Sequence, residues 1–181
     1  MQEMTSVKKA IITAICTALC VVLPQAFHAI PGAASVYSPI HIPVLLCGLV
    51  CGGAYGLFCG LAGVLLSSLL TGMPAAAVLP PMLAECAVYG LVAGLLMRLI
   101  RSGNVYADLY LSLITAMIAG RAAAGLIRGL LFGGGGYSLS AWVSAYFIAS
   151  LPGIILHLVL VPAIYIALMR ANLIPTRYLK D

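Results

Sequence analysis

Long apolar runs, separated by short polar or glycine- and proline-rich stretches, fill nearly the whole of this chain of 181 residues. The runs do not alternate between apolar and polar residues with a period of two, as the strands of a membrane barrel would. A predominantly apolar run of about 20 residues is long enough to cross a bilayer as a helix. The pattern therefore predicts an all-α integral membrane protein, with residues 1–181 forming a single transmembrane domain.

The breaks between the runs predict where the spans begin and end. We expect spans at residues 7–27, 81–101, 106–132 and 141–169, and loops at residues 28–39, 71–80 and 133–140. The stretch 40–70 is ambiguous, because it reads either as one long span or as a hairpin of two short spans that breaks around Gly52–Gly53. The first run follows two lysines, as a signal-peptide core does, but it is longer than a typical core and is expected to be a retained helix.

Charge favours the hairpin. With six spans, both chain ends lie on one side of the membrane together with the turn near residue 101. The loops on the opposite side then carry no positive residue. The side of the chain ends carries seven: Lys8, Lys9, Arg98, Arg101, Arg170, Arg177 and Lys180. Because positive residues gather on the cytoplasmic side, we predict six transmembrane helices with both termini cytoplasmic (N-in/C-in).

Composition excludes several classes of protein. Hydrophobic residues make up 64% of the chain, charged residues 7%, and the mean hydropathy is +1.17. The loops are too short for a catalytic or nucleic-acid-binding domain, so the net charge of +5 is attributed to anchoring at the cytoplasmic side. No enzyme motif, metal-ligand spacing or nucleotide-binding loop is present, and the six cysteines lie in apolar runs, where they act as small apolar residues. We predict no enzyme, no metal site and no cofactor in this chain.

A few ionisable residues interrupt the apolar runs and are the first candidates for function, because burying charge in a bilayer is costly. Arg121 and Arg128 are seven residues apart and share a helix face, and Glu85 and Tyr89 are four apart on another helix. Their net positive charge predicts a pocket open to the outside for an anionic ligand, since a guanidinium binds a carboxylate well. The alternative is a structural salt bridge from Glu85 to one arginine, with the other reaching to the interface.

Other polar side chains are weaker candidates. His41 opens the second predicted span, and a lone mid-span histidine such as His157 is more often bonded to a neighbouring helix than to a ligand. Three tyrosines near the predicted outer side are able to stack on a ligand: Tyr37, Tyr137 and Tyr146.

Small residues recur every four positions and predict close helix packing. Glycines do so in three groups: Gly48, Gly52, Gly56 and Gly60; Gly90 and Gly94; Gly125 and Gly129. Ala10, Ala14 and Ala18 form a stripe on the first helix, whose partner is either another helix of this chain or another subunit.

Taken in order, these segments resemble the substrate-binding S components of energy-coupling factor (ECF) vitamin transporters over essentially the whole chain. The resemblance lies in the Ala10-X-X-X-Ala14-X-X-X-Ala18 stripe and in the stretch from His41-Ile-Pro-Val to Ser67-Ser-Leu-Leu-Thr-Gly-Met-Pro74. It extends to Glu85-X-X-X-Tyr89-Gly90 and to Gly120-Arg121.

This resemblance implies a plasma-membrane protein that captures a small water-soluble vitamin or precursor from outside. It implies partners that deliver the vitamin inward: a transmembrane T subunit and two cytoplasmic ATPases that use ATP. If the roles known in that family are carried over to this chain, the stripe of Ala10, Ala14 and Ala18 would dock on the T subunit. The substrate pocket would include Glu85, Tyr89, Arg121 and Arg128, with His41 and Thr71 as weaker members.

The ligand expected first is pantothenate, because the His-Ile-Pro and Leu-Thr-Gly-Met-Pro elements resemble S components assigned to it. Folate, a pyridoxine-type vitamin and a thiamine precursor stay open, whereas one tryptophan and four phenylalanines are few for stacking a flavin. The rival from another class is a stand-alone small-solute channel or secondary carrier, in which the alanine stripe would be internal packing.

Overall fold

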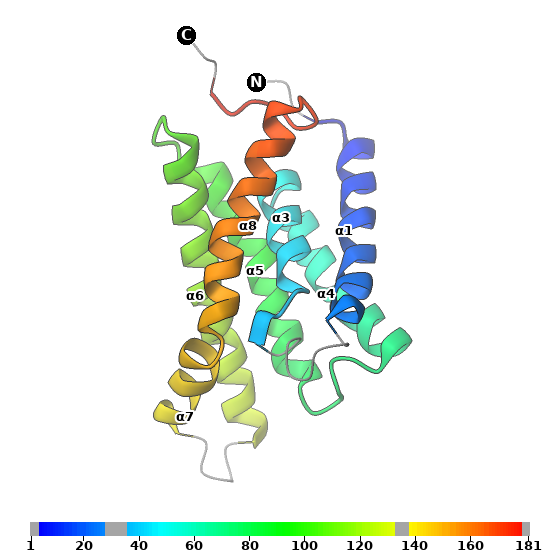
Figure 1. Cartoon of the computed structure of the whole chain (residues 1–181), viewed down its shortest axis with the longest axis vertical. Coiled ribbons are helices and arrows are strands. Elements are labelled where there is room, and N and C mark those ends of the chain that lie inside the picture. The colour runs from blue at the N-terminus through cyan, green and yellow to red at the C-terminus, as the bar shows by residue number, and fades with distance from the viewer. Residues whose placement is uncertain (1–3, 28–35, 133–137, 179–181) are drawn as a thin grey trace.

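The computed structural model describes residues 4–27, 36–132 and 138–178, and every regular element in that part of the chain is a helix. The longer helices are α1 (Ser6–Ala26), α4 (Gly53–Thr71), α5 (Leu79–Leu99), α6 (Val105–Phe132) and α8 (Leu151–Arg170). The shorter ones are α3 (His41–Cys51), α7 (Leu139–Val143) and a π-helical turn, η2 (Ser144–Ile148). Successive long segments run in alternating directions, so that the start of α1 and the end of α8 lie at the same end of the bundle (Figure 1). We call this the terminal end.

The predicted break in the stretch 40–70 is present, but one of its two segments is shorter than a span. Gly52 ends α3 with a φ of 102°, a conformation that favours glycine, and α4 starts at the next residue. At 1.5 Å per residue, the 11 residues of α3 cover only about 16 Å. Five of the described helices are long and apolar enough to cross a membrane. The structure thus supports a multi-pass membrane protein, while six spans and the N-in/C-in orientation stay predictions.

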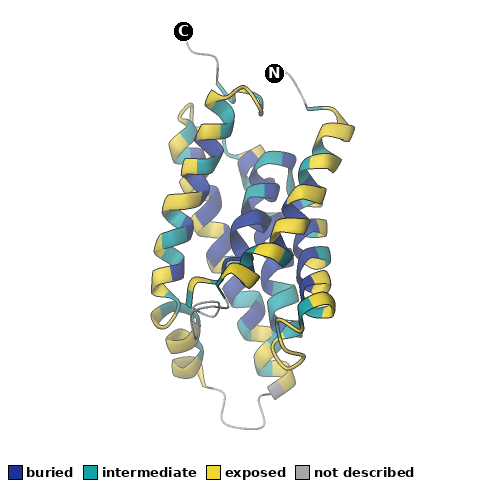
Figure 2. Ribbon diagram, turned by 45° about the vertical axis from the view of Figure 1, so that its right-hand side comes forward, coloured by how far each residue is buried: buried dark blue, intermediate teal, exposed yellow. Residues whose placement is uncertain are grey.

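The short helix α3 forms the centre of the bundle. Nine of its residues are buried, and it packs against α1, α4, α5 and α8. Buried positions gather at the middle of the bundle in Figure 2, whereas the outer faces of the helices are exposed. Those exposed faces are apolar, as Leu69, Leu130 and Val159 illustrate. Such a surface suits lipid contact, and the almost wholly apolar sequence of α3 reflects burial on all sides.

Close packing by glycine is confirmed where α3, α4 and α5 cross. A Cβ atom built on Gly56 would lie 2.6 Å from the Cα of Gly48 and 2.7 Å from the carbonyl carbon of Gly90. Such distances are shorter than any real Cβ contact, so the three backbones touch only because all three residues are glycine. This crossing brings Glu85, little more than one turn before Gly90 on α5, close to the central helix.

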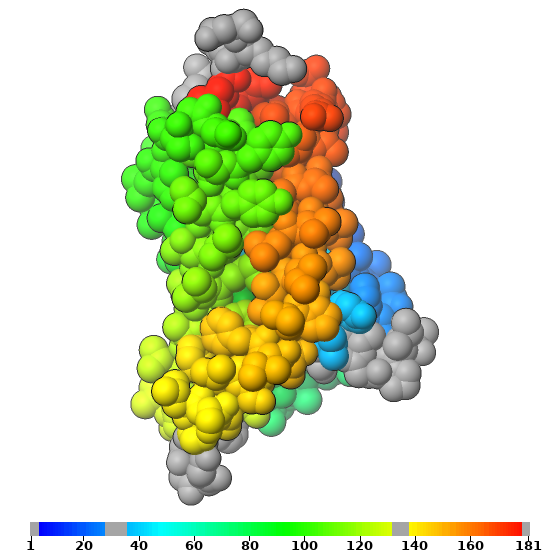
Figure 3. All heavy atoms as spheres, turned by 60° about the vertical axis from the view of Figure 1, so that its left-hand side comes forward, coloured from blue at the N-terminus to red at the C-terminus, as the bar shows by residue number. Residues whose placement is uncertain are grey.

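The last predicted span, residues 141–169, is not one continuous helix. It starts as α7, passes through the π-helical turn η2 and is interrupted at Ala149 and Ser150 before α8 begins. Apolarity alone gave no sign of this break, because π-helical turns depend on local backbone geometry and are frequent at functional sites. Figure 3 shows α6 and α8 side by side, with η2 and α7 (yellow) at the end remote from the chain termini.

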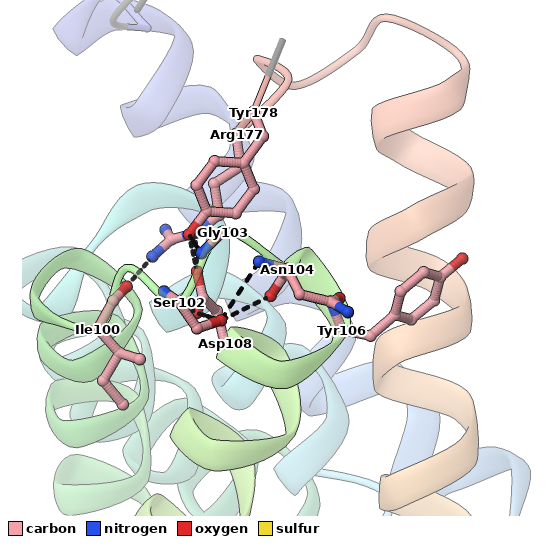
Figure 4. A network of polar contacts seen from close by, with 8 residues as sticks. All are labelled: Ile100, Ser102, Gly103, Asn104, Tyr106, Asp108, Arg177 and Tyr178. Carbon is pink, nitrogen blue, oxygen red and sulfur yellow. Dashed lines mark hydrogen bonds and ion pairs between the residues drawn. The ribbon is translucent and has the colours of Figure 1, made fainter. Parts of the chain in front are cut away.

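A network of polar side chains closes the terminal end of the bundle (Figure 4). Asp108, fully buried in the first turn of α6, accepts hydrogen bonds from Ser102 N (3.0 Å) and Ser102 Oγ (2.7 Å). Its other oxygen accepts from Arg177 Nε and Tyr178 Oη, both at 2.5 Å. Arg177 also donates to the carbonyl of Ile100. The tail after α8 is therefore tied to the turn between α5 and α6.

Candidate functional site

A cavity of about 400 Å³ opens at the end of the bundle opposite the terminal end. Its walls come from the ends of α1, α4 and α6, the starts of α3 and α5, the loop after α4, and η2. Ligand sites of about 300–1,000 Å³ are usual in proteins. Four of the six residues expected to bind substrate line the cavity: His41, Glu85, Arg121 and Arg128.

Arg121 lies deepest among the cations of the cavity and is only 3% exposed. Its Nη1 donates to Ser150 Oγ at 2.5 Å, and its guanidinium carbon stands 5.6 Å from the centre of the Phe147 ring. Its Nε has no hydrogen-bond partner. Leaving a buried donor without a hydrogen-bond partner costs free energy. A ligand that accepts a hydrogen bond from this nitrogen would remove that cost.

Trp142 fixes the segment that holds Ser150 and Phe147. Its indole Nε1 donates to the Arg121 carbonyl at 3.1 Å, and its ring fills the space left by the missing side chain of Gly125. The ring also meets Phe147 edge-on, with 5.3 Å between centroids. The η2 segment is thus docked on α6 at the level of Arg121.

Glu85 is held by Tyr89, which stands one helical turn further along α5. The phenol of Tyr89 donates to Glu85 Oε1 at 2.7 Å, and Tyr89 itself is fully buried and does not line the cavity. Gly120 on α6 leaves room for the Tyr89 ring. Tyr89 therefore positions Glu85 rather than touching the contents of the cavity.

The structure does not join Glu85 and Arg121 in an ion pair. Glu85 accepts from Tyr89 and Arg121 donates to Ser150, whereas a true ion pair, Arg177–Asp108, forms at the terminal end. The alternative of a structural salt bridge from Glu85 to one of the two arginines therefore finds no support at Arg121. Both side chains face the cavity with hydrogen-bonding capacity to spare.

His41 and His157 lie next to each other, His41 at the cavity wall and His157 behind it. His41 lines the cavity, is 3% exposed, and has no hydrogen-bond partner at either ring nitrogen. Its ring lies edge-on to Tyr89 at 4.9 Å and is 5.5 Å from the ring of His157. His157 is fully buried and does not reach the cavity.

Thr71 is not a lining residue, and its hydroxyl instead shapes the loop after α4. It donates to the Ser67 carbonyl at 2.7 Å and accepts from Met73 N at 3.2 Å. Ser67 and Ser68 donate to the carbonyls of Met73 and Pro74 at 2.8 and 2.9 Å. These hydroxyls hold the loop over the cavity, which explains the cluster of serine and threonine at the end of an apolar helix.

Most of the remaining lining residues carry no signal in the sequence. Of the three tyrosines considered, Tyr146 lines the cavity, Tyr37 packs on Phe27, and Tyr137 lies outside the described residues. The lining residues that sequence reasoning missed are mainly small or apolar: Pro24, Ser38, Pro39, Ile40, Ser67, Met73, Pro74, Ala75, Val78, Met82, Ala145 and Ser150. The resemblance had drawn attention to the segment Ser67–Pro74, but not to which of its residues line the site.

The alanine stripe of α1 faces outward. Ala10, Ala14 and Ala18 are exposed, whereas the opposite face of α1 packs into the bundle. Ala10 and Ala14 line a shallow apolar groove together with Tyr55 and Phe58 of α4. Within this chain the stripe is therefore not internal packing between helices.

No group of three or more possible metal ligands occurs among the described residues. All six cysteines are buried and none forms a disulfide.

Comparison with known proteins identifies the family of this chain. A family model described as "ECF transporter, substrate-specific component" matches residues 8–165. No curated protein and no solved structure matches the chain. The matched residues cover most of the chain, including most of α1, the cavity and most of α8. The chain therefore belongs to the family of substrate-specific components of ECF transporters.

Proposed function

We propose that this protein captures a small water-soluble carboxylate from outside the cell and holds it in the cavity for delivery through an ATP-driven ECF complex. The observation that carries the proposal is the buried Arg121, whose Nε is unpartnered beside a cavity of about 400 Å³. An ionised carboxylate supplies the acceptor that this guanidinium lacks.

The charge of the cavity favours an anion. Arg121 and Arg128 line it with Glu85 as the single acidic residue, so the described lining carries a net positive charge. Arg128 is exposed towards the opening, whereas Arg121 is buried. An entering anion thus meets Arg128 first and is neutralised at Arg121, where the lower dielectric strengthens the attraction.

The ligand we propose first is pantothenate, with folate, a pyridoxine-type vitamin and a thiamine precursor as the other members of the test panel. Apart from His41 and Tyr146, the described walls present no aromatic ring. Proline, methionine and aliphatic side chains line much of the rest, which suits a ligand with an aliphatic body better than one with a large flat ring.

Thermal-shift measurements with the purified chain and this panel test the function directly. A tight ligand at about 1,000 times its Kd should stabilise the protein by about 4 kcal/mol. A shift with one carboxylate supports substrate capture and names the substrate. If no compound shifts the unfolding temperature and vesicles carrying the purified chain take up solute without ATPase subunits, the chain is instead a channel or carrier.

Replacing Arg121 with glutamine should weaken binding of that carboxylate by about 10- to 100-fold, because a hydrogen bond to a charged group contributes about 1.5–3 kcal/mol. The fluorescence of Trp142, the single tryptophan, gives the readout, since its indole contacts the Arg121 carbonyl. Arg98→Gln, an exposed arginine near the terminal end, is the matched control and should leave Kd unchanged. Equal affinities of the Arg121→Gln and Arg98→Gln variants would show that Arg121 does not bind the carboxylate.

The partners we propose are a transmembrane T subunit and two cytoplasmic ATPases, with the T subunit docking on Ala10, Ala14 and Ala18. Support comes from the exposure of all three alanines and from the apolar groove beside two of them. Small residues allow close approach of helices in lipid. This docking requires α1 to be accessible within the bilayer, with both termini cytoplasmic.

Replacing Ala14 with tryptophan should abolish uptake by the assembled complex while leaving ligand affinity of the isolated chain within about twofold, because the indole fills the groove and blocks helix approach. Co-purification of the T subunit with the variant measures the loss of docking. Ile15→Trp, at the neighbouring exposed position, is the control and should retain uptake. Normal uptake by Ala14→Trp would show that the stripe is not the docking surface.

A further inference from the structure

The inner wall of the cavity carries polar groups that a carboxylate alone would not use. His41 is only 3% exposed, lines the cavity, and has two ring nitrogens without partners. A neutral imidazole carries one donor and one acceptor, whichever tautomer is present. Leaving this donor and this acceptor without hydrogen-bond partners is costly in a buried site. The cavity therefore suits a ligand with a polar group at this wall.

Glu85 sets the chemistry of the group that faces it. Tyr89 occupies Oε1 with one hydrogen bond of 2.7 Å, and the remaining acceptor capacity of the carboxylate serves the cavity that Glu85 lines. A ligand carboxylate is repelled from this position and is drawn to Arg121 and Arg128. The group next to Glu85 must therefore donate a hydrogen bond.

Charge balance selects a neutral donor. One ligand carboxylate already cancels the excess of one positive charge among the described lining side chains. An ammonium group at Glu85 would restore that excess inside a poorly solvated site, which is unfavourable. A hydroxyl group carries no charge, donates to Glu85 and accepts from an N–H of His41.

We propose that His41 and Glu85 form a second, neutral subsite that binds a hydroxyl group of the ligand, so that the substrate class is an aliphatic carboxylate with a hydroxyl group at its other end. This inference rests on the proposed function, because the carboxylate is assigned to Arg121 and Arg128. The apolar walls contributed by Ile40, Val78 and Met82 bind the aliphatic part between the two ends.

Three related compounds test the two ends of the ligand separately. Pantothenate carries both a carboxylate and hydroxyl groups, N-(3,3-dimethylbutanoyl)-β-alanine lacks the hydroxyl groups, and panthenol lacks the carboxylate. Titration of the full-length protein, followed by Trp142 fluorescence and by calorimetry, should show tightest binding of pantothenate. The compound without hydroxyl groups should bind about 10- to 100-fold more weakly, because it leaves His41 without a partner and Glu85 with Tyr89 alone.

Two variants test whether His41 is the residue that distinguishes pantothenate from the compound without hydroxyl groups. In His41→Leu, the preference for pantothenate over the compound without hydroxyl groups should shrink by about fivefold, since the hydroxyl group loses the donor of His41 and keeps only Glu85. His41→Gln keeps a donor and an acceptor and should retain most of the preference. Thermal unfolding of both variants without ligand separates a loss of folding from a loss of recognition, and the glutamine variant carries the test if the leucine variant does not fold.

Each outcome has a distinct meaning. Equal binding of pantothenate and the compound without hydroxyl groups would overturn the hydroxyl subsite and leave the carboxylate function standing. Binding of panthenol as tight as that of pantothenate would overturn the role of the arginines instead. Tighter binding of an analogue with an amino group in place of a hydroxyl would show that Glu85 takes a cation. No binding of any of these compounds would overturn the substrate class.

Discussion

Replacing Gly90 with leucine should prevent the bundle from assembling, and Gly90→Ala should already lower its stability by about 3 kcal/mol or more, the upper end of the range for overpacking a core. A Cβ atom at this position would lie 2.8 Å from the Cα of Gly56 and closer still to its carbonyl group. Added volume in a packed core typically costs about 1–3 kcal/mol, through shifts of neighbouring side chains. Here the obstacle is backbone, which has no rotamer to change, so the helices themselves must separate.

The expected loss of stability in Gly90→Ala is opposite to the effect of helix propensity, which favours alanine over glycine by about 1 kcal/mol in a helix interior. Thermal unfolding in detergent and size-exclusion profiles measure the effect. Ala163→Leu, at an exposed position of α8, adds a side chain of the same kind where there is room and should be nearly neutral. A Gly90→Leu protein as stable as this control would mean that α4 and α5 do not cross at these glycines.

Replacing Asp108 with asparagine should release the tail after α8 and lower stability by about 3 kcal/mol, the lower end of the range for breaking a buried ion pair. Asp108 is fully buried and accepts four hydrogen bonds, two of them from the tail residues Arg177 and Tyr178. Burial alone lowers the pKa of Arg177, but its hydrogen bonds with Asp108 and Tyr178 raise that pKa above the ordinary value, so the guanidinium stays charged. Without the carboxylate this charge loses its counterion.

Hydrogen exchange and limited proteolysis give a local readout of this change. In Asp108→Asn, the amides of Ser102 and Gly103 should exchange faster, because the first donates to Asp108 and the second to Tyr178. Arg101→Gln, an exposed arginine of the same turn, is the control and should leave both amides protected. Unchanged exchange in Asp108→Asn would show that the tail is held by other contacts. Ligand affinity should stay the same, because the cavity lies at the opposite end.

The alternation of apolar and polar runs was sufficient to predict the helices, because a chain in a bilayer must satisfy its backbone hydrogen bonds within each segment. The observed long helices begin and end within a few residues of the predicted spans, except where the last span breaks. The family, too, was recognisable from short motifs, and the family model supports it. The rarity of charge within the runs led directly to Glu85 and Arg121, since an ionisable residue in an apolar helix is costly to keep.

Other features depended on contacts between distant segments. Hydropathy does not distinguish a helix buried in protein from one facing lipid, so the sequence did not show that α3 is a short helix at the centre of the bundle. Nor did the sequence show that Tyr89 holds Glu85 while Thr71 holds a loop, because the two roles differ only in where each hydroxyl points. The walls of the cavity are mostly small and apolar residues, which have no chemical signature along the chain.

The sequence by itself thus determined the class of protein, the approximate limits of its long helices, and the charged residues that line its cavity. These follow from the cost of moving polar groups into lipid, which acts on each segment independently. The tertiary structure decided which segment is central, where the last span breaks, and which polar side chains line the cavity. Those features depend on packing among helices far apart in the sequence, as at Gly48, Gly56 and Gly90, where the absence of three side chains lets the backbones touch.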